Sequence, residues 1–392
     1  MGIFNKLANR LIAATLGKKA FTSNPFLGFV IEADESEVIA DELFSVGMAY
    51  QQGAYMLPAD TKKAIQYFRK AAERGHAVAQ LFMVMATMRY HDDHSDEVMD
   101  WLHKAADQGE KQAMYNLGIS YHRGDVNGMV DITKSFDLFS RAAEKGYGGA
   151  CGRLATIYWN GGDGVPANPK IAKFWALEAF LLGNDNDKGL FPAIASEEDI
   201  VDNKANVDKI LREACEEGVP HAIYRVGDTF VSTDIKKAAE YWTKAAEKGS
   251  LYAKCNLAIY ASKELKDYTT ANKLFEEAAK FGIEKAQVSL AESYYFGMGV
   301  EKDIAKAWYW TEKALNLGSP EARYLLAMMC IQNALTEILP DNVMRGASYM
   351  EQAARDNYPP ALEFFERQQT DNPEFSRKKT VDSAWYDYCH GR

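Results

Sequence analysis

The chain has 392 residues, of which 47% are hydrophobic and 26% charged, so it can bury a large core beneath a polar exterior. Its formal net charge of −10 opposes nonspecific binding to nucleic acid. No run approaches the roughly 18 to 20 apolar residues that a membrane span needs, so we expect no membrane-spanning helix.

Residues 1–38 form an N-terminal segment with a cationic amphipathic start and an acidic lead-in. Within residues 1–20, apolar side chains alternate with Lys6, Arg10, Lys18 and Lys19. The apolar run between the basic residues is at the lower limit for a signal peptide, and no small-residue cleavage site follows. We expect a helix that caps the first repeat, and contact with an anionic membrane surface is the alternative.

From residue 39 onward the chain repeats itself with a period in the thirties, and residues 39–183 hold the first four copies. The pattern Ala-Ala-x-x-Gly recurs with variations, and its last residue closes each copy. These closing residues are Gly75, Gly109, Gly146, Gly183, Gly218, Gly249, Gly282, Gly318 and Asn357. A period of this length indicates repeats made of paired helices.

Three other positions recur at fixed distances before the closing residue. An alanine stands four residues earlier in every copy, and a large apolar or aromatic residue stands eight earlier. Asp or Asn stands fifteen residues earlier, with His94 the one exception. Asp and Asn cap helix starts, the large residue and the alanine share a helix face, and Gly or Asn adopts the left-handed conformation that ends a helix. This pattern predicts the second helix of each repeat, and the first helix then follows the preceding closing residue.

Candidates for chemistry are few. His91, Asp92, Asp93 and His94 resemble a loose metal site, but the register places them at an inter-helix turn, where the acids suit helix capping. The glycines of residues 161–165 are not followed by the Lys-Ser/Thr of a phosphate-binding loop. The five cysteines form no metal-ligand cluster. We therefore predict no catalytic residue, no metal and no cofactor, and the cysteine pattern favours a reducing, cytoplasmic compartment.

Residues 184–217 depart from the pattern. They keep Ile210 and Ala214 before Gly218 but lack a recognisable first helix. An acidic stretch with Pro192 stands in its place, so this segment is a degenerate repeat or an acidic insert.

Residues 218–365 resume the repeats, and one copy is especially clear. Tyr-Tyr-Phe-Gly-Met-Gly-Val at residues 294–300 is followed by Asp303, Lys306-Ala307, Trp310 and Lys313-Ala314. This succession resembles the Sel1-like repeat, a relative of the tetratricopeptide repeat, and the likeness recurs over residues 39–365. The resemblance implies an all-α fold, a right-handed α/α superhelix (solenoid) of about nine helix-turn-helix repeats. The polar tail at residues 366–392 ends in an aromatic cluster that we expect to cap the solenoid, with a mobile partner-binding segment as the alternative.

The resemblance also implies a binding surface. Tetratricopeptide-like arrays bind peptides or helices along a concave groove lined by their first helices. The groove-facing positions hold Phe44, Met85, Met88, Tyr115, His122, Trp159, His221, Tyr224, Tyr252, Tyr295 and Tyr324. A strip rich in aromatic residues and methionine is typical of interface hot spots, although any one of these residues could instead pack between repeats.

The function predicted from these features is a noncatalytic scaffold or adaptor that binds a protein or peptide partner and no nucleic acid. Sel1-like proteins are frequent in bacteria, and the resemblance implies roles in signalling, secretion, host interaction or immunity to toxins. Two alternatives come from other classes: a membrane-peripheral assembly factor anchored by residues 1–20, and a metal-dependent enzyme using His91 and His94.

Overall fold

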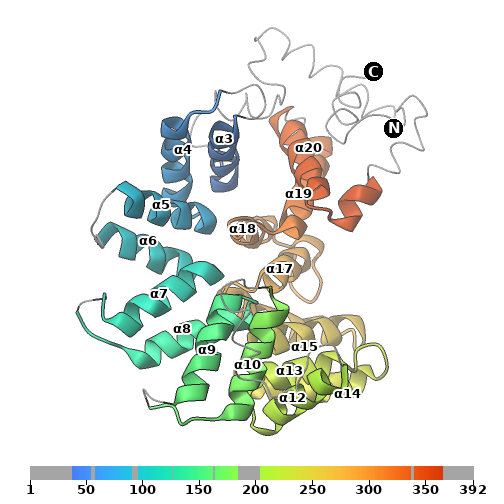
Figure 1. Ribbon diagram of the computed structural model, residues 1–392. Coiled ribbons are helices and arrows are strands. Elements are labelled where there is room, and N and C mark those ends of the chain that lie inside the picture. Colours follow the sequence, from blue (N-terminus) through green and yellow to red (C-terminus); the bar gives the residue numbers. More distant parts are fainter. Residues whose placement is uncertain are drawn as a thin grey trace. The chain divides into compact units, whose positions relative to one another are not determined.

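In a computed structural model of the chain, the described elements are all α-helices (Figure 1). The structure describes residues 38–53, 58–90, 96–126, 128–161, 164–183, 204–336 and 340–364. The chain divides into two compact units: residues 1–79 with 304–392 form unit 1, and residues 80–303 form unit 2. The predicted all-α solenoid of helix pairs is confirmed in the described residues.

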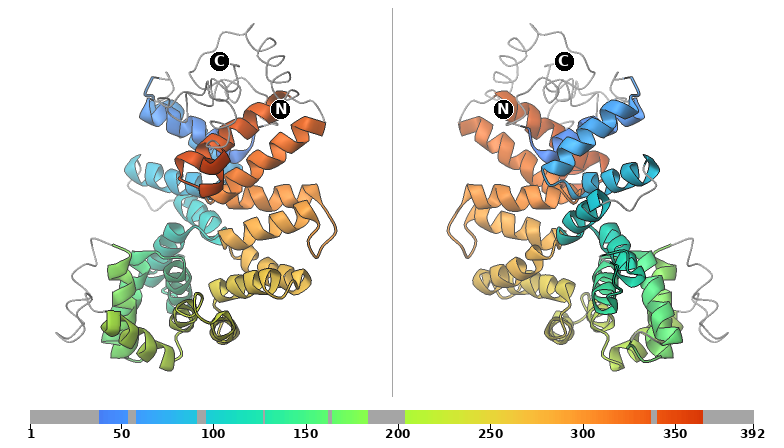
Figure 2. Two further views of the ribbon diagram at one scale, coloured as in Figure 1. Left: turned by 90° about the vertical axis from the view of Figure 1, so that its right-hand side faces the viewer. Right: turned by 90° about the vertical axis from the view of Figure 1, so that its left-hand side faces the viewer.

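The described helices alternate between the first and second helices of successive repeats. The first helices are α3 (Ala40–Gln52), α5 (Ala77–Tyr90), α7 (Lys111–Arg123), α9 (Gly148–Asn160), α13 (Pro220–Asp228), α15 (Leu251–Lys263), α17 (Glu284–Phe296) and α19 (Pro320–Thr336). The second helices are α4 (Thr61–Glu73), α6 (Asp96–Asp107), α8 (Ile132–Glu144), α10 (Pro169–Leu181), α12 (Lys204–Glu216), α14 (Ile235–Glu247), α16 (Tyr268–Lys280), α18 (Ile304–Leu315) and α20 (Pro340–Arg355). Within each unit, consecutive helices pack against one another as pairs (Figure 2). The copy that closes at Gly218 shows only α12 among the described residues. Residues 184–203, which hold most of the acidic segment before α12, lie outside the described residues.

Second helices begin at the predicted capping residues. The carboxylate of Asp60 accepts a hydrogen bond from the Lys63 amide at 3.0 Å, and Asp234 accepts one from Lys237 at 3.0 Å. Asp131, Asn168 and Asp267 cap α8, α10 and α16 in the same way. The last copy differs, because α20 begins at Pro340 and Asn342 lies within its first turn. Proline suits the first helical position, where an amide hydrogen has no partner within the helix.

Second helices also end as predicted. Every closing residue has a positive φ, from 58° at Asn357 to 97° at Gly249. The alanine four residues earlier is 0% exposed in every copy: Ala71, Ala105, Ala142, Ala179, Ala214, Ala245, Ala278, Ala314 and Ala353. A residue without a long side chain at this point lets the neighbouring helix approach closely.

The position that is buried in every copy stands one residue later than the large residue of the sequence pattern. The residue eight before the closing residue is buried in some copies, such as Trp101 and Trp175, but only half-buried in others, such as Tyr241. The residue seven before it is buried in every copy: Phe68, Leu102, Phe139, Ala176, Leu211, Trp242, Phe275, Thr311 and Met350.

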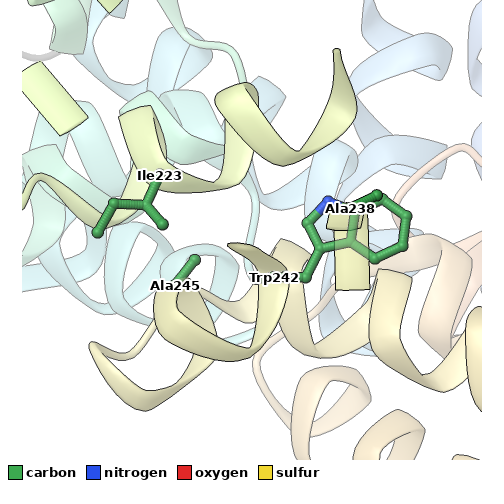
Figure 3. Packing of buried hydrophobic residues seen from close by; sticks show 5 residues of the cluster. Ile223, Ala238, Trp242 and Ala245 are labelled. Atoms are coloured by element: carbon green, nitrogen blue, oxygen red, sulfur yellow. The ribbon is translucent and has the colours of Figure 1, made fainter. Parts of the chain in front are cut away.

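This buried side chain fits against a small residue of the first helix. A Cβ at Gly118 would lie 2.8 Å from the ring of Phe139, and one at Gly227 would lie 2.9 Å from the ring of Trp242. Figure 3 shows the core of the pair formed by α13 and α14, with Ile223 on the first helix and Trp242 between the turns that carry Ala238 and Ala245 on the second.

Within unit 1, buried ion pairs join the first described helix to the last ones. Arg345 of α20 donates hydrogen bonds to the Glu42 carboxylate of α3, at 2.5 Å from Nε and 3.2 Å from Nη2. The adjacent Asp41 lies 3.5 Å from Nε2 of His76 and 3.7 Å from Nη2 of Arg323. Burial by itself raises the pKa of Asp41, but His76 and Arg323 outweigh it and lower this pKa. At Glu42 burial outweighs Arg345, and the pKa is raised.

Within unit 2, two closing glycines approach each other backbone to backbone. A Cβ on Gly282 would overlap the carbonyl oxygen of Gln108, and one on Gly109 would lie 2.8 Å from the carbonyl oxygen of Phe281. Lys145 joins this contact by donating a hydrogen bond to the Gly282 carbonyl at 2.5 Å, and burial lowers the pKa of its ammonium group to about 8. Gly109 and Gly282 are therefore required both for their conformation and for the space they leave.

We expect Gly282→Ala to lower the free energy of unfolding by about 2 to 5 kcal/mol. The left-handed backbone costs a residue with a Cβ about 1 to 2 kcal/mol, and overpacking against Gln108 adds about 1 to 3 kcal/mol. Gly249→Ala is the matched control, because its φ is also positive but no atom would lie within 4 Å of the new Cβ. Urea unfolding followed by circular dichroism compares the two variants. Equal losses would contradict the close approach.

We expect Arg345→Met to lower the free energy of unfolding by about 3 to 5 kcal/mol, because it leaves the Glu42 carboxylate buried without a cation. In the control variant Lys104→Met, the lost partner of Asp100 is half exposed, and the loss should stay below about 1 kcal/mol. Hydrogen exchange of α3 and α20 would localise the effect. A loss no greater than that of the control would disprove the burial of this pair.

Candidate partner-binding surface

The residues predicted to line the groove all lie on first helices. Phe44 on α3 and Tyr324 on α19 belong to unit 1, and the others belong to unit 2. The side chain of Met88 lies outside the described part of α5. The residues predicted to line the groove are therefore divided between the two units.

Two members of the set lie inside unit 2. His221 is 7% exposed and stacks on Trp175, with ring centroids 5.6 Å apart. Tyr295 is 5% exposed and meets the ring of Phe296 edge-on at 4.9 Å. Because both side chains are buried, they support the surface rather than form it.

Several members are half-buried and pack against neighbouring rings. In unit 1, Phe44 stacks on His76 at 4.4 Å, and Tyr324 lies 5.5 Å from Tyr358. In unit 2, the ring of Tyr115 lies 4.9 Å from that of Tyr147. These aromatic side chains fill the spaces between repeats and leave only part of each ring exposed.

Tyr224 and Tyr252 form a second half-buried pair in unit 2, with ring centroids 6.1 Å apart. Burial raises the pKa of both phenols, helped by Asp228 at Tyr224 and by Glu284 and Glu144 at Tyr252. Both phenols therefore stay neutral near pH 7 and can donate hydrogen bonds.

Three members of the set are exposed, and they lie on consecutive first helices of unit 2. Met85 on α5 is 46% exposed, Trp159 on α9 is 44% exposed, and His122 on α7 is exposed as well. Tryptophan is the residue type most enriched at interface hot spots, and methionine adapts its shape to different partners. These three side chains are the part of the predicted strip that a partner can reach without repacking the protein.

A pocket of about 260 Å³ opens between α7 and α9, and the exposed His122 lines it. Its apolar wall is formed by Ile119, Phe139 and Ile157, and its polar lining includes His122, Arg123 and Arg153. The sequence pattern missed the two arginines because each stands one position after a position predicted to face the groove. Arg123 lies fourteen residues after the closing Gly109, and Arg153 lies seven residues after the closing Gly146. Including the position after each predicted groove position would have identified Arg123 and Arg153.

Buried polar residues behind the surface are used to join helices. Glu178 of α10 is 5% exposed and accepts hydrogen bonds from Arg225 of α13 on both oxygens, at 2.5 and 2.6 Å. Burial raises the pKa of Glu178, but His221 and Arg225 outweigh it and lower this pKa. Asp228 accepts hydrogen bonds from Trp242 at 2.9 Å and from Asn256 at 3.2 Å, while burial raises its pKa. Sequence spacing gave no sign of the pairs Glu178–Arg225 and Asp228–Asn256, because their members lie in different repeats, whereas Asp228 and Trp242 belong to the two helices of one repeat.

The described residues also bear on the metal-binding and membrane alternatives. Among the described residues, no group of three or more His, Cys, Asp or Glu side chains is placed to hold a metal ion. The cluster from His91 to His94 lies outside the described residues, as do residues 1–20 and the terminal aromatic cluster. None of the described helices combines the length and the apolar character needed to span a membrane.

The repeat pattern and the helix pairs define an array of Sel1-type repeats, and a family comparison agrees. The family model for the Sel1 repeat matches residues 43–76, 99–110, 111–147, 149–184, 220–250, 252–280, 284–319 and 320–358. These matches cover more than half of the chain, so the protein belongs to the Sel1-repeat family. No match falls on residues 185–219, where the sequence predicted a degenerate copy.

Curated relatives share about a quarter of their residues with this chain. An uncharacterised protein of Neisseria meningitidis serogroup B is 26% identical over 286 residues, which are 61% of this chain and 58% of that protein. A chitin synthase regulator of Saccharomyces cerevisiae is 25% identical over 291 residues, which are 70% of this chain and 37% of the regulator. Cytochrome c oxidase assembly factor 7A of Xenopus laevis is 25% identical over 36% of this chain and 64% of the factor. The chain thus spans less than two thirds of each of these proteins.

Three solved structures are similar to this chain. A protective antigen of uropathogenic Escherichia coli with an SLR fold is 23% identical, with a TM-score of 0.41, and the match covers 93% of this chain and 79% of the antigen. A Sel1 repeat protein of Oxalobacter formigenes is 22% identical, with a TM-score of 0.34, over 81% of this chain and 93% of that protein. An immunity protein of Pseudomonas aeruginosa is 18% identical, with a TM-score of 0.29, over 54% of this chain and 82% of that protein.

Exposed and enclosed members of the predicted strip should differ in their effect on stability. We expect Trp159→Ala to change the free energy of unfolding by less than about 1 kcal/mol, because Trp159 is exposed and its loss leaves no enclosed cavity. Tyr295→Ala should cost about 3 to 5 kcal/mol, because it leaves a cavity inside unit 2. Urea unfolding of both variants measures the difference. Similar losses would show that Trp159 belongs to the core.

Proposed function

We propose that this protein is a noncatalytic adaptor that holds a protein partner on the first-helix surface of unit 2. The observation that carries the proposal is the exposure of Met85, His122 and Trp159 on three consecutive first helices. Large apolar side chains rimmed by polar residues are typical of protein interaction sites. The half-buried Tyr115, Tyr224 and Tyr252 belong to the same predicted strip, and each leaves part of its ring exposed.

The family supports an adaptor role. The curated relatives are described as a regulator of chitin synthase and as an assembly factor for cytochrome c oxidase, and both descriptions are of proteins that serve another protein. The buried carboxylates Asp41, Glu42 and Glu178 each lie within 4 Å of an arginine side chain, and these ion pairs connect helices. The negative charges of these three carboxylates are therefore balanced by arginines within the fold.

A cytoplasmic location is supported by the state of the thiols. Cys151, Cys215, Cys255 and Cys330 are free, and all except Cys215 are buried. Burial raises the pKa of Cys330 to about 12, so its thiol stays protonated and unreactive. We further propose a bacterial role in which one partner is held tightly, as in immunity or secretion, in preference to several weaker partners.

Affinity purification of the tagged full-length chain from its native cells tests the adaptor role. The triple variant Met85→Ser, His122→Ala, Trp159→Ala should lose the captured partner by at least about tenfold, because hot-spot residues carry most of an interface's affinity. Tyr309→Ala is the control, because it removes a ring that is 51% exposed on the second helix α18. Mass spectrometry quantifies the partner. Recovery at the wild-type level with the triple variant would exclude this surface.

The same experiment separates the two kinds of adaptor. One protein recovered in stoichiometric amount would indicate a dedicated partner, as expected for immunity or secretion. Several proteins in smaller amounts would indicate a signalling adaptor and would contradict the dedicated role.

A further inference from the structure

The pocket between α7 and α9 presents two arginines that have no partner in the described protein. Arg123 and Arg153 form no hydrogen bond, ion pair or ring contact with the described residues, although both line the pocket. Three other arginines of unit 2 are engaged: Arg225 binds Glu178, Arg141 lies 3.4 Å from Asp137, and Arg212 donates to the carbonyl of Asp208. The two pocket arginines therefore keep their donors available.

The pocket walls make this positive charge effective. The described residues of the lining include no Asp or Glu, and His122 adds a further nitrogen donor to the two guanidinium groups. Ile119, Ile157 and the buried Phe139 form an apolar wall beside them. A wall of low dielectric concentrates the field of nearby charges, and guanidinium forks bind carboxylates with two parallel hydrogen bonds. A basic pocket is unexpected on a chain with a net charge of −10, so it is a local feature rather than a consequence of composition.

We propose that this pocket binds the carboxylate of an acidic side chain from the protein partner, with the carboxylate between Arg123 and Arg153 and the apolar part of the side chain against Ile119 and Ile157. The proposal rests on the proposed function, because the exposed His122 of that surface lines the pocket. A cavity of about 260 Å³ accepts a side chain rather than a helix. The net charge of the chain disfavours an extended polyanion such as nucleic acid as the occupant.

Degenerate peptide pools test the ligand class without knowledge of the partner. Two pools of N-acetylated, C-amidated peptides carry either Glu or Gln at the central position, and a third carries central Gln with a free C-terminal carboxylate. Retention on the immobilised full-length chain is measured at low salt by mass spectrometry. We expect the Glu pool to be retained at least about fivefold more than the Gln pool, and this preference to shrink at high salt.

The variant Arg123→Gln, Arg153→Gln should remove the preference for the Glu pool. The matched control Lys209→Gln, Arg212→Gln deletes two exposed positive charges from α12 of the same unit and should leave the preference intact. Equal retention of the Glu and Gln pools, or a preference that survives in the Arg123/Arg153 variant, would overturn the proposal. Stronger retention of the pool with the free C-terminus would overturn the assignment to an acidic side chain.

Failure of the pocket and failure of the proposed function are distinguishable. If the triple variant of Met85, His122 and Trp159 loses the captured partner while the Arg123/Arg153 variant keeps it, the surface stands and the pocket proposal is wrong. If both variants keep the partner, the proposed function itself is wrong.

Discussion

The described structure depends on the close contact between the two helices of each repeat. A buried side chain seven residues before the closing residue packs on the first helix, and a fully buried alanine three residues later lets a neighbouring helix approach. Glycine or asparagine in the left-handed conformation then ends the helix and directs the chain into the next repeat. Because the same contact recurs along the chain, each helix pair is stabilised mainly by its neighbours, as expected of solenoids.

Contacts between repeats far apart in sequence add to this local packing. In unit 1 the buried pair of Glu42 and Arg345 connects α3 to α20, and in unit 2 the backbone of Gly109 meets that of Gly282. A buried ion pair gains little over apolar packing, since both charges lose their hydration, but it strongly disfavours any arrangement that separates them. These contacts therefore fix the arrangement within each unit more than they raise its stability.

The same packing rule divides the aromatic side chains into two groups. Rings such as Tyr295 and His221 are buried and serve the fold. Trp159 and Met85, in contrast, are exposed on first helices of unit 2. The arginines of the pocket between α7 and α9 have no partner within the described protein, while the buried carboxylates elsewhere are matched with arginines. The unmatched charge and the exposed apolar side chains together mark this surface as different from the rest of unit 2.

The sequence by itself determined the repeat family, the pairing of helices, the capping residues and the closing glycines. These features depend on residues within one or two helical turns, so their spacing is sufficient to reveal them. The tertiary structure alone decided which side chains of the first helices are covered, so that Tyr295 is buried, Trp159 is exposed, and Arg123 and Arg153 line one pocket. It also decided which distant residues meet, such as Glu42 and Arg345, because a contact across some 300 residues leaves no periodic trace in the sequence.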